Sequence, residues 1–129
     1  MRELLLEAFK KLDSAVEAAV LDDGWPDPEK IEQIWPHLQA LVELGDLFPT
    51  PLQELYRRLV ESFMRETQLW LDCLALQKRW FDAGDLDLWR FYSEMAIKSA
   101  LACRNLRERL YALSIVAERH DQAREEMAA

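Results

Sequence analysis

The stretch that decides the fold lies at residues 78–92 and reads KRWFDAGDLDLWRFY. A long segment with helical periodicity ends before Gly84, and another begins after Asp85. Glycine is the usual residue just past a helix end, and aspartate is a strong N-cap. The tight turn at Ala83-Gly84-Asp85 therefore predicts a long antiparallel helical hairpin over residues 50–126. We expect the acidic N-terminal helices, residues 1–49, to pack against this hairpin.

After the turn, a single apolar seam with alternating spacings of three and four residues predicts one long helix. The members of this seam are Trp89, Tyr92, Ala96, Ser99, Cys103, Leu106, Leu110, Leu113, Ala117 and His120. A helix of this extent is about 65 Å long at 1.5 Å per residue. The small seam residues allow close approach of a partner helix, so leucine at Ser99 or Cys103 should overpack it by about 1–3 kcal/mol.

Before the turn, the sequence Thr50-Pro51-Leu52-Gln53 has the features of a helix start. Thr50 is the predicted N-cap, Pro51 occupies the first helical position, and Gln53 completes a capping box. The predicted apolar stripe of this helix is Leu55, Leu59, Phe63, Trp70, Leu74 and Phe81.

The N-terminal residues predict shorter helices. The first runs from Glu3 to about Leu21, and Asp22-Asp23-Gly24 ends it. It carries one apolar stripe at spacings of three and four residues: Leu5, Phe9, Leu12, Val16 and Ala19. A second helix begins at Asp27-Pro28, with an aspartate N-cap and proline in the first turn. Pro36 within it predicts a kink or a break into two short helices.

These elements predict an all-α fold: a single domain, residues 1–129, forming a four-to-five-helix bundle built on the hairpin. Half of the 129 residues are hydrophobic, with only 3 Gly and 5 Pro, which favours long helices over strands and turns. Both cysteines, Cys73 and Cys103, lie in helical patterns without metal-ligand spacing, as expected of reduced thiols in the cytoplasm.

The net charge of −8 is unevenly distributed. Residues 1–54 hold 12 acids and 4 bases, whereas residues 55–129 hold 12 of each. An acidic chain repels nucleic acid and anionic membranes. The N-terminus lacks the layout of a signal peptide, and no apolar run approaches the roughly 20 residues that span a bilayer. We therefore expect a cytoplasmic protein with no membrane association.

The sequence offers little for catalysis or metal binding. Neither His37 nor His120 belongs to a Glu-x-x-His pair of the kind found in metal-binding bundles. The serines lie within predicted helices, and no glycine-rich phosphate loop occurs. We expect no enzyme activity, no metal and no cofactor. The alternative is a helical metal-binding or catalytic bundle that uses His37 or His120 with nearby carboxylates.

Two short strings are similar to family motifs. Leu55-Tyr56-Arg57 resembles the signature tripeptide of the LYR family of small helical mitochondrial assembly factors, which carry it near their start, whereas a long acidic segment precedes it here. Arg104-Asn105 with Tyr111 resembles the Arg-Asn-x-x-x-His-x-Tyr motif of HEPN helical nucleases, but Arg109 stands at the histidine position. That departure implies a non-catalytic relative, and we assign neither family.

Folding the hairpin about its turn brings six arginines to the end away from the turn: Arg57, Arg58, Arg65, Arg104, Arg107 and Arg109. Acids interleave with them, so a solvated face with pairs such as Glu61–Arg65 is one interpretation. The others are docking of the acidic N-terminal helices, binding of an acidic partner protein, and binding of nucleic acid.

At the turn, Trp80 and Trp89 with neighbouring aromatic residues predict either an aromatic plug or an anchor for a partner. Trp25, in a linker, is the tryptophan expected to be most exposed. The resulting hypothesis is a non-enzymatic protein-interaction module, such as an adaptor, assembly factor or secretion-type chaperone. Its ligand would be a partner protein or a second copy in a homodimer, bound through the apolar seam or the hairpin ends. A nucleic-acid-associated helical subunit is the remaining alternative.

Overall fold

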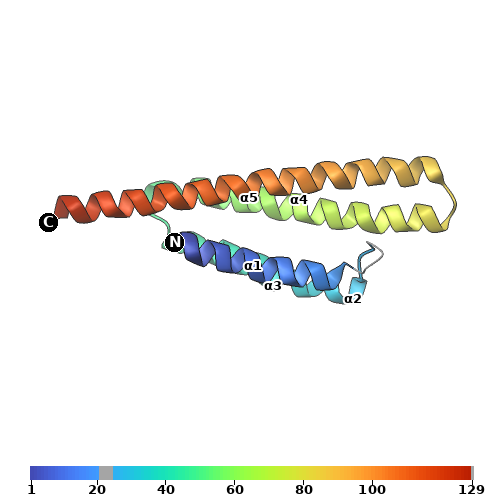
Figure 1. Cartoon of the computed structure of the whole chain (residues 1–129), viewed down its shortest axis with the longest axis horizontal. Helices are drawn as coiled ribbons and strands as arrows, with labels where there is room; N and C mark the ends of the chain where they lie inside the picture. Colours follow the sequence, from blue (N-terminus) through green and yellow to red (C-terminus); the bar gives the residue numbers. More distant parts are fainter. Residues whose placement is uncertain (21–24, 129) are drawn as a thin grey trace.

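The computed structural model describes residues 1–20 and 25–128, and every regular element in these ranges is a helix. Helices α4 (Thr50–Asp82) and α5 (Leu86–Ala128) form an antiparallel hairpin. On one side of it lies a second layer, built from α1 (Arg2–Ala19), α2 (Pro28–Ile31) and α3 (Trp35–Glu43) (Figure 1). The predicted all-α class and hairpin are confirmed.

The turn forms as its sequence predicts. Gly84 has a positive φ of 76°, a conformation that glycine adopts without steric cost. The Asp85 carboxylate accepts a hydrogen bond from the backbone N–H of Leu88 at 3.1 Å, which caps the start of α5. Two helices of 33 and 43 residues are thereby joined with almost no intervening loop.

The predicted seam of α5 packs against α4. Ala96, Ser99 and Leu110 are buried, and the Thr67 hydroxyl of α4 lies 3.7 Å from the Cys103 sulfur. Small side chains at these positions allow the two backbones to approach closely. The chain's own helix α4 therefore covers this part of the seam, and Ala96, Ser99 and Leu110 are not accessible to an external partner.

The predicted stripe of α4 is wrong in part, because α4 has neighbours on two sides. Leu55 and Phe81 were expected in the core but are 50% and 52% exposed. Phe63 of the predicted stripe is buried. The other buried residues of α4 turn toward both α5 and the second layer: Tyr56, Val60, Thr67, Leu71 and Cys73. The predicted capping box also does not form. Thr50 is the first helical residue and Pro49 the N-cap, while the Gln53 amide donates to the Phe48 carbonyl at 2.9 Å.

The second layer follows its sequence signals closely. Leu5, Phe9, Leu12 and Ala19 of α1 are buried. Asp27 caps α2 by accepting from the backbone N–H of Glu29 at 3.1 Å. The break predicted from Pro36 is present, since a 3-10 turn at Glu32–Ile34 separates α2 from α3. A second 3-10 turn, Leu44–Leu47, follows α3. The helix stop predicted at Asp22-Asp23-Gly24 lies outside the described residues.

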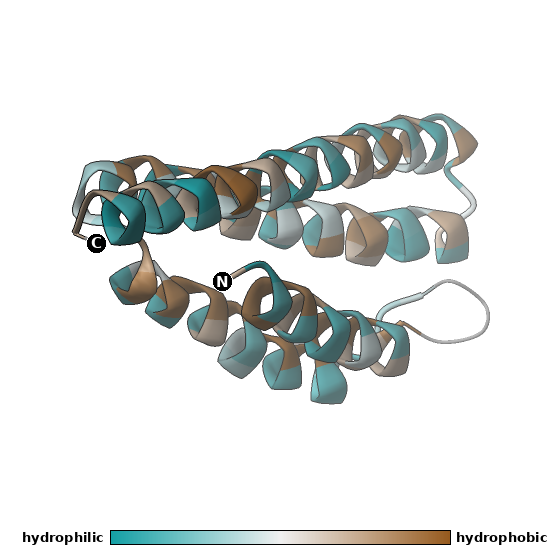
Figure 2. Cartoon of the chain, turned by 60° about the vertical axis from the view of Figure 1, so that its left-hand side comes forward, coloured by the Kyte–Doolittle hydropathy of each residue, from teal (hydrophilic) through white to brown (hydrophobic). Residues whose placement is uncertain are grey.

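The two layers are joined most tightly at the end of the hairpin away from the turn. Phe9 meets Phe63 edge-to-face with ring centroids 5.5 Å apart, and Phe48 stacks on Tyr56 at 4.2 Å. The Tyr56 hydroxyl donates to the Leu41 carbonyl, and burial raises the pKa of this phenol. A Cβ at Gly45 would lie 3.1 Å from the Tyr56 ring, so glycine permits this contact. Apolar segments recur along the helices of both layers (Figure 2).

Candidate functional site

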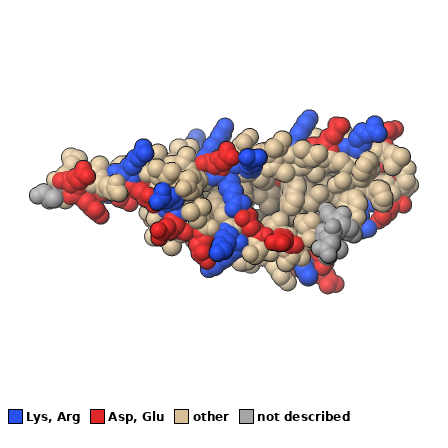
Figure 3. Space-filling model, viewed as in Figure 1, with Lys and Arg blue, Asp and Glu red and all other residues tan. Residues whose placement is uncertain are grey.

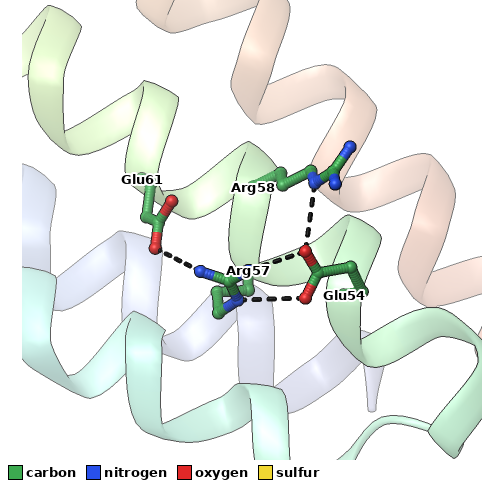
Figure 4. Close-up of polar contacts among 4 residues, drawn as sticks. All are labelled: Glu54, Arg57, Arg58 and Glu61. Atoms are coloured by element: carbon green, nitrogen blue, oxygen red, sulfur yellow. Dashed lines mark hydrogen bonds and ion pairs between the residues drawn. The ribbon is translucent and has the colours of Figure 1, made fainter.

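Four of the six arginines predicted at the far end of the hairpin are held by carboxylates. Arg57 lies between Glu54, at 2.6 Å, and Glu61, at 2.9 Å, and Arg58 bonds to Glu54 at 3.1 Å (Figure 4). Hydrogen bonds from Arg57, and then from Arg58, lower the pKa of Glu54. These pairs are exposed and lie within α4, so they contribute little to stability or to recognition. The expected Glu61–Arg65 pair does not form; Glu61 pairs with Arg57 instead.

Arg104 and Arg107 lie on the inner face of α5, toward α1. Arg107 makes a bidentate contact with Asp13, both bonds measuring 2.7 Å, and its guanidinium lies 4.4 Å from the centroid of the Phe9 ring. Among the described residues, Arg104 forms an ion pair only with Glu108, one turn along α5, at 3.5 Å. Of the six arginines, Arg107 is thus the one whose ion pair joins the hairpin to the acidic N-terminal layer.

Arg65 and Arg109 lie elsewhere, on what we call the outer face of the hairpin. They line a depression of about 340 Å³ with Ser62, Glu66, Ala102, Asn105 and Leu106. No described residue of the second layer lines this depression. Neither arginine has an ion-pair partner within the described parts of the chain. Two guanidinium groups are therefore free to bind a carboxylate from outside.

Exposed apolar residues continue the outer face in both directions. Leu55, Ser62 and Leu69 are seven residues apart on α4, and Ala102, Arg109 and Val116 are seven apart on α5. Residues at this spacing share one side of a helix. Leu55 is 50% exposed, Leu69 40% and Val116 48%. Sequence reasoning missed this row because Leu55 was placed in the core; the seven-residue spacing was the signal that could have identified it.

The aromatic residues near the turn contact one another. The Trp25 ring lies 5.8 Å from Phe81, which lies 6.2 Å from Trp89, and the Trp89 indole N–H is buried without an acceptor among the described residues. Trp25 is partly exposed, as the other four tryptophans are, and it packs on the hairpin through Phe81. The Arg79 guanidinium lies over Trp80 at 5.4 Å. The arrangement favours the plug over a projecting anchor.

A cleft opens on the inner face, between α1 and the hairpin. Its volume is about 250 Å³, and its walls come from α1, α4 and α5: Leu12, Asp13, Val16, Phe63, Thr67, Trp70, Ala100, Cys103, Arg104 and Arg107. Figure 3 shows mostly uncharged surface between the layers on the side toward the turn. Burial raises the pKa of the Cys103 thiol, so this cysteine is protonated and a weak nucleophile at neutral pH.

The described residues contain neither a candidate metal cluster nor a membrane-spanning helix. They contain no group of three or more His, Cys, Asp and Glu side chains arranged to hold a metal ion. None of their helices combines the length and the apolar character needed to cross a membrane. Positive and negative side chains also alternate over the surface in view, without a continuous basic track (Figure 3).

The two family-like strings behave as ordinary parts of this fold. Tyr56 is a buried link between the layers, and Arg57 pairs within its own helix. Arg104 lines the inner cleft while Asn105 lines the outer depression, so these two side chains do not converge on one site. Comparison with known proteins identifies no relative: no family model, curated protein or solved structure matches the chain.

Proposed function

We propose that this chain is a non-enzymatic protein-interaction module, of the adaptor or assembly-factor kind, whose outer face binds an amphipathic helix of a partner protein. The observation that carries the proposal is the pair Arg65 and Arg109, without ion-pair partners among the described residues, in the middle of an exposed apolar row. Protein-binding surfaces combine apolar contacts with unpaired arginines in this way.

The outer face also defines the chemistry of the partner. Small residues, Ser62 and Ala102, line the depression and admit side chains from a helix lying along the hairpin. Leu55 and Leu69 lie 14 residues apart, about 21 Å of helix, so the partner would present apolar residues over a similar length. A carboxylate near the middle of its apolar stripe would meet Arg65 and Arg109.

A designed peptide pair tests this proposal. One helical peptide carries leucines at seven-residue spacing with central glutamates, and the other carries lysines in place of the glutamates. We expect fluorescence anisotropy to show that wild-type protein prefers the glutamate peptide. Reversing both charges, Arg65→Glu with Arg109→Glu, should weaken glutamate-peptide binding by about tenfold and restore binding of the lysine peptide. An unchanged preference in the double variant would contradict the proposal.

A second pair of variants distinguishes binding at the apolar row from non-specific hydrophobic binding. Leu69→Lys should abolish peptide binding, whereas Ile97→Lys should not. Ile97 is 62% exposed but lies five residues from Ala102, on another side of α5. Sedimentation of both variants also tests a homodimer. A dimer disrupted by Leu69→Lys alone would assign the outer face to a second copy of the chain and overturn the proposed heterologous partner.

A further inference from the structure

The inner cleft is a separate feature that protein binding at the outer face does not use. We propose that it binds a small amphiphile, a molecule with an apolar body and one anionic head group, of the size of a medium-chain carboxylate. The cleft lies between α1 and the hairpin, on the opposite side of α5 from the depression that Arg65 and Arg109 line. This inference therefore stands or falls independently of the proposed partner helix.

The cleft exists because large side chains separate the two layers on both sides of it. Phe9 and Phe63 fill the interface at one side, with their rings 5.5 Å apart. Trp25 and Phe81 meet near the turn at 5.8 Å. Between these contacts α5 presents small side chains, including Ala100 and Cys103, so the walls do not meet. A ligand can enter without displacing a packed side chain.

The interior of the cleft is mostly apolar, and the Thr67 hydroxyl in its wall already has a hydrogen-bond acceptor. Leu12, Val16 and Trp70 supply apolar walls. The Thr67 hydroxyl is already used, because it donates to the Phe63 carbonyl at 2.8 Å and lies 3.7 Å from the Cys103 sulfur. A purely polar ligand would therefore lose hydration without gaining hydrogen bonds. Hydrocarbon is the chemistry that this interior accepts.

The charged groups at the edge of the cleft select an anionic head group. Arg107 is held by Asp13 in a bidentate contact, which neutralises that carboxylate. Arg104 remains weakly held, since its only ion-pair partner among the described residues is Glu108 at 3.5 Å and its side chain is 74% exposed. The head group can displace Glu108 from Arg104 at little cost. A carboxylate, the simplest such group, matches the fork of guanidinium donors.

The volume limits the size of the apolar body. An engineered cavity of about 150 Å³ holds benzene, and sites for drug-sized ligands begin near 300 Å³. At about 250 Å³ the cleft lies between these cases, which suits a chain of about eight carbons. Octanoate is therefore the probe, and octanol, with the same chain length and no charge, is its control.

Isothermal titration of the full chain with octanoate tests the proposal. We expect one saturable site, and octanoate should slow alkylation of Cys103 by N-ethylmaleimide while leaving buried Cys73 at its own rate. Arg104→Gln should weaken the binding of octanoate by about threefold to fivefold, the effect expected of one exposed charge pair, and should leave the affinity for octanol unchanged. Ala100→Phe, which fills the cleft, should abolish binding of both. Ala112→Phe, an exposed position outside the cleft, should not.

Two results would overturn the inference: the absence of saturable octanoate binding to wild-type protein, and octanoate affinity that Ala100→Phe leaves unchanged. If the Ala100→Phe chain does not fold, Cys103→Leu fills the same cleft from a neighbouring position and decides the matter in the same way. Glutamate-peptide binding at the outer face should persist in every cleft variant that folds. A joint loss of both activities would indicate unfolding rather than failure of either proposal.

Discussion

Tyr56 is the residue that most directly ties the hairpin to the second layer. Its ring stacks on Phe48 and its hydroxyl donates to the Leu41 carbonyl in a buried position. Removing the hydroxyl by Tyr56→Phe leaves that carbonyl without its partner. We expect a loss of about 1–2 kcal/mol in the free energy of unfolding, measured by urea denaturation. Tyr111→Phe is the matched control and should stay within about 0.5 kcal/mol, since Tyr111 is 36% exposed. Equal losses in both variants would rule out the buried hydrogen bond as the cause.

The same phenol makes stability depend on pH in the alkaline range. Burial raises the pKa of Tyr56 in the folded protein, whereas the unfolded phenol ionises near pH 10. Above that pH the unfolded chain loses the proton first, so the unfolded state gains stability. We expect the wild-type advantage over Tyr56→Phe to be constant below about pH 10. It should then fall by up to about 1.4 kcal/mol per pH unit. Parallel curves for the two proteins would contradict this.

Ser99 and Cys103 look alike in the sequence, but their surroundings differ. Ser99 is 3% exposed within the contact between α4 and α5, whereas Cys103 also borders the inner cleft. Ser99→Leu should therefore cost about 1–3 kcal/mol by overpacking. Cys103→Leu should destabilise the fold by less, below about 1 kcal/mol, because the cleft can take up the added carbons. The sequence alone predicted the same loss for both substitutions. Thermal unfolding of the two variants measures the difference, and equal shifts would mean that the cleft does not accommodate the added carbons.

At the scale of elements, the ion pair between Arg107 and Asp13 joins α5 to the middle of α1 across the two layers. Arg107→Glu would replace the Asp13 contact with repulsion. Both side chains are partly exposed, so solvent screens the pair and we expect only about a fivefold loss of hydrogen-exchange protection in α1. Arg104→Glu should leave α1 unchanged because the Arg104 ion pair lies within α5. Equal effects of the two reversals would show that overall charge, and not this contact, holds α1.

The success of prediction differed between α5 and α4 for a physical reason. The seam of α5 is the side of this helix that faces α4, and its three-four repeat identified Ala96, Ser99 and Leu110 as buried. Helix α4 packs against α5 and the second layer together. Its buried surface is therefore wider than one stripe, and Tyr56 and Val60 were missed. The predictions at Gly84 and Asp27 are confirmed because the chemistry there depends on adjacent backbone, although the capping box predicted on the same basis at Thr50 does not form.

The candidate sites were harder to predict than the helices. Sequence spacing placed six arginines at one end of the hairpin, but it could not tell which carboxylate each would choose. Both Arg57 and Arg65 lie four residues from Glu61, but Glu61 pairs with Arg57, and Arg65 has no ion-pair partner among the described residues. The inner cleft depends on the spacing between layers, which rings such as Phe9 and Trp25 set, and no pattern within one helix reports that distance.

At the scale of the whole molecule, α5 is longer than its packing requires. Ala117 is its last buried residue, and Glu118 accepts a hydrogen bond from the backbone N–H of Arg2 at 3.0 Å. Deleting residues 122–129 should therefore change the midpoint of thermal unfolding very little, with a free-energy effect within about 0.5 kcal/mol. Ending the chain at Val116 should destabilise it clearly. A large drop in the unfolding midpoint on deletion of residues 122–129 would show that the end of α5 packs against the rest of the protein in solution.

The contact between Arg2 and Glu118 joins residues 116 positions apart. A ribosome makes the N-terminus first, at about 5–20 residues per second, so roughly 5–20 s separate the synthesis of Leu5 from that of Leu110. During this interval the apolar side of α1 has its neighbours in the second layer but lacks α5. Contacts so remote in sequence form late in folding. A nascent chain paused before α5 would therefore display apolar surface to the cell, and its fate would depend on translation speed and on chaperones.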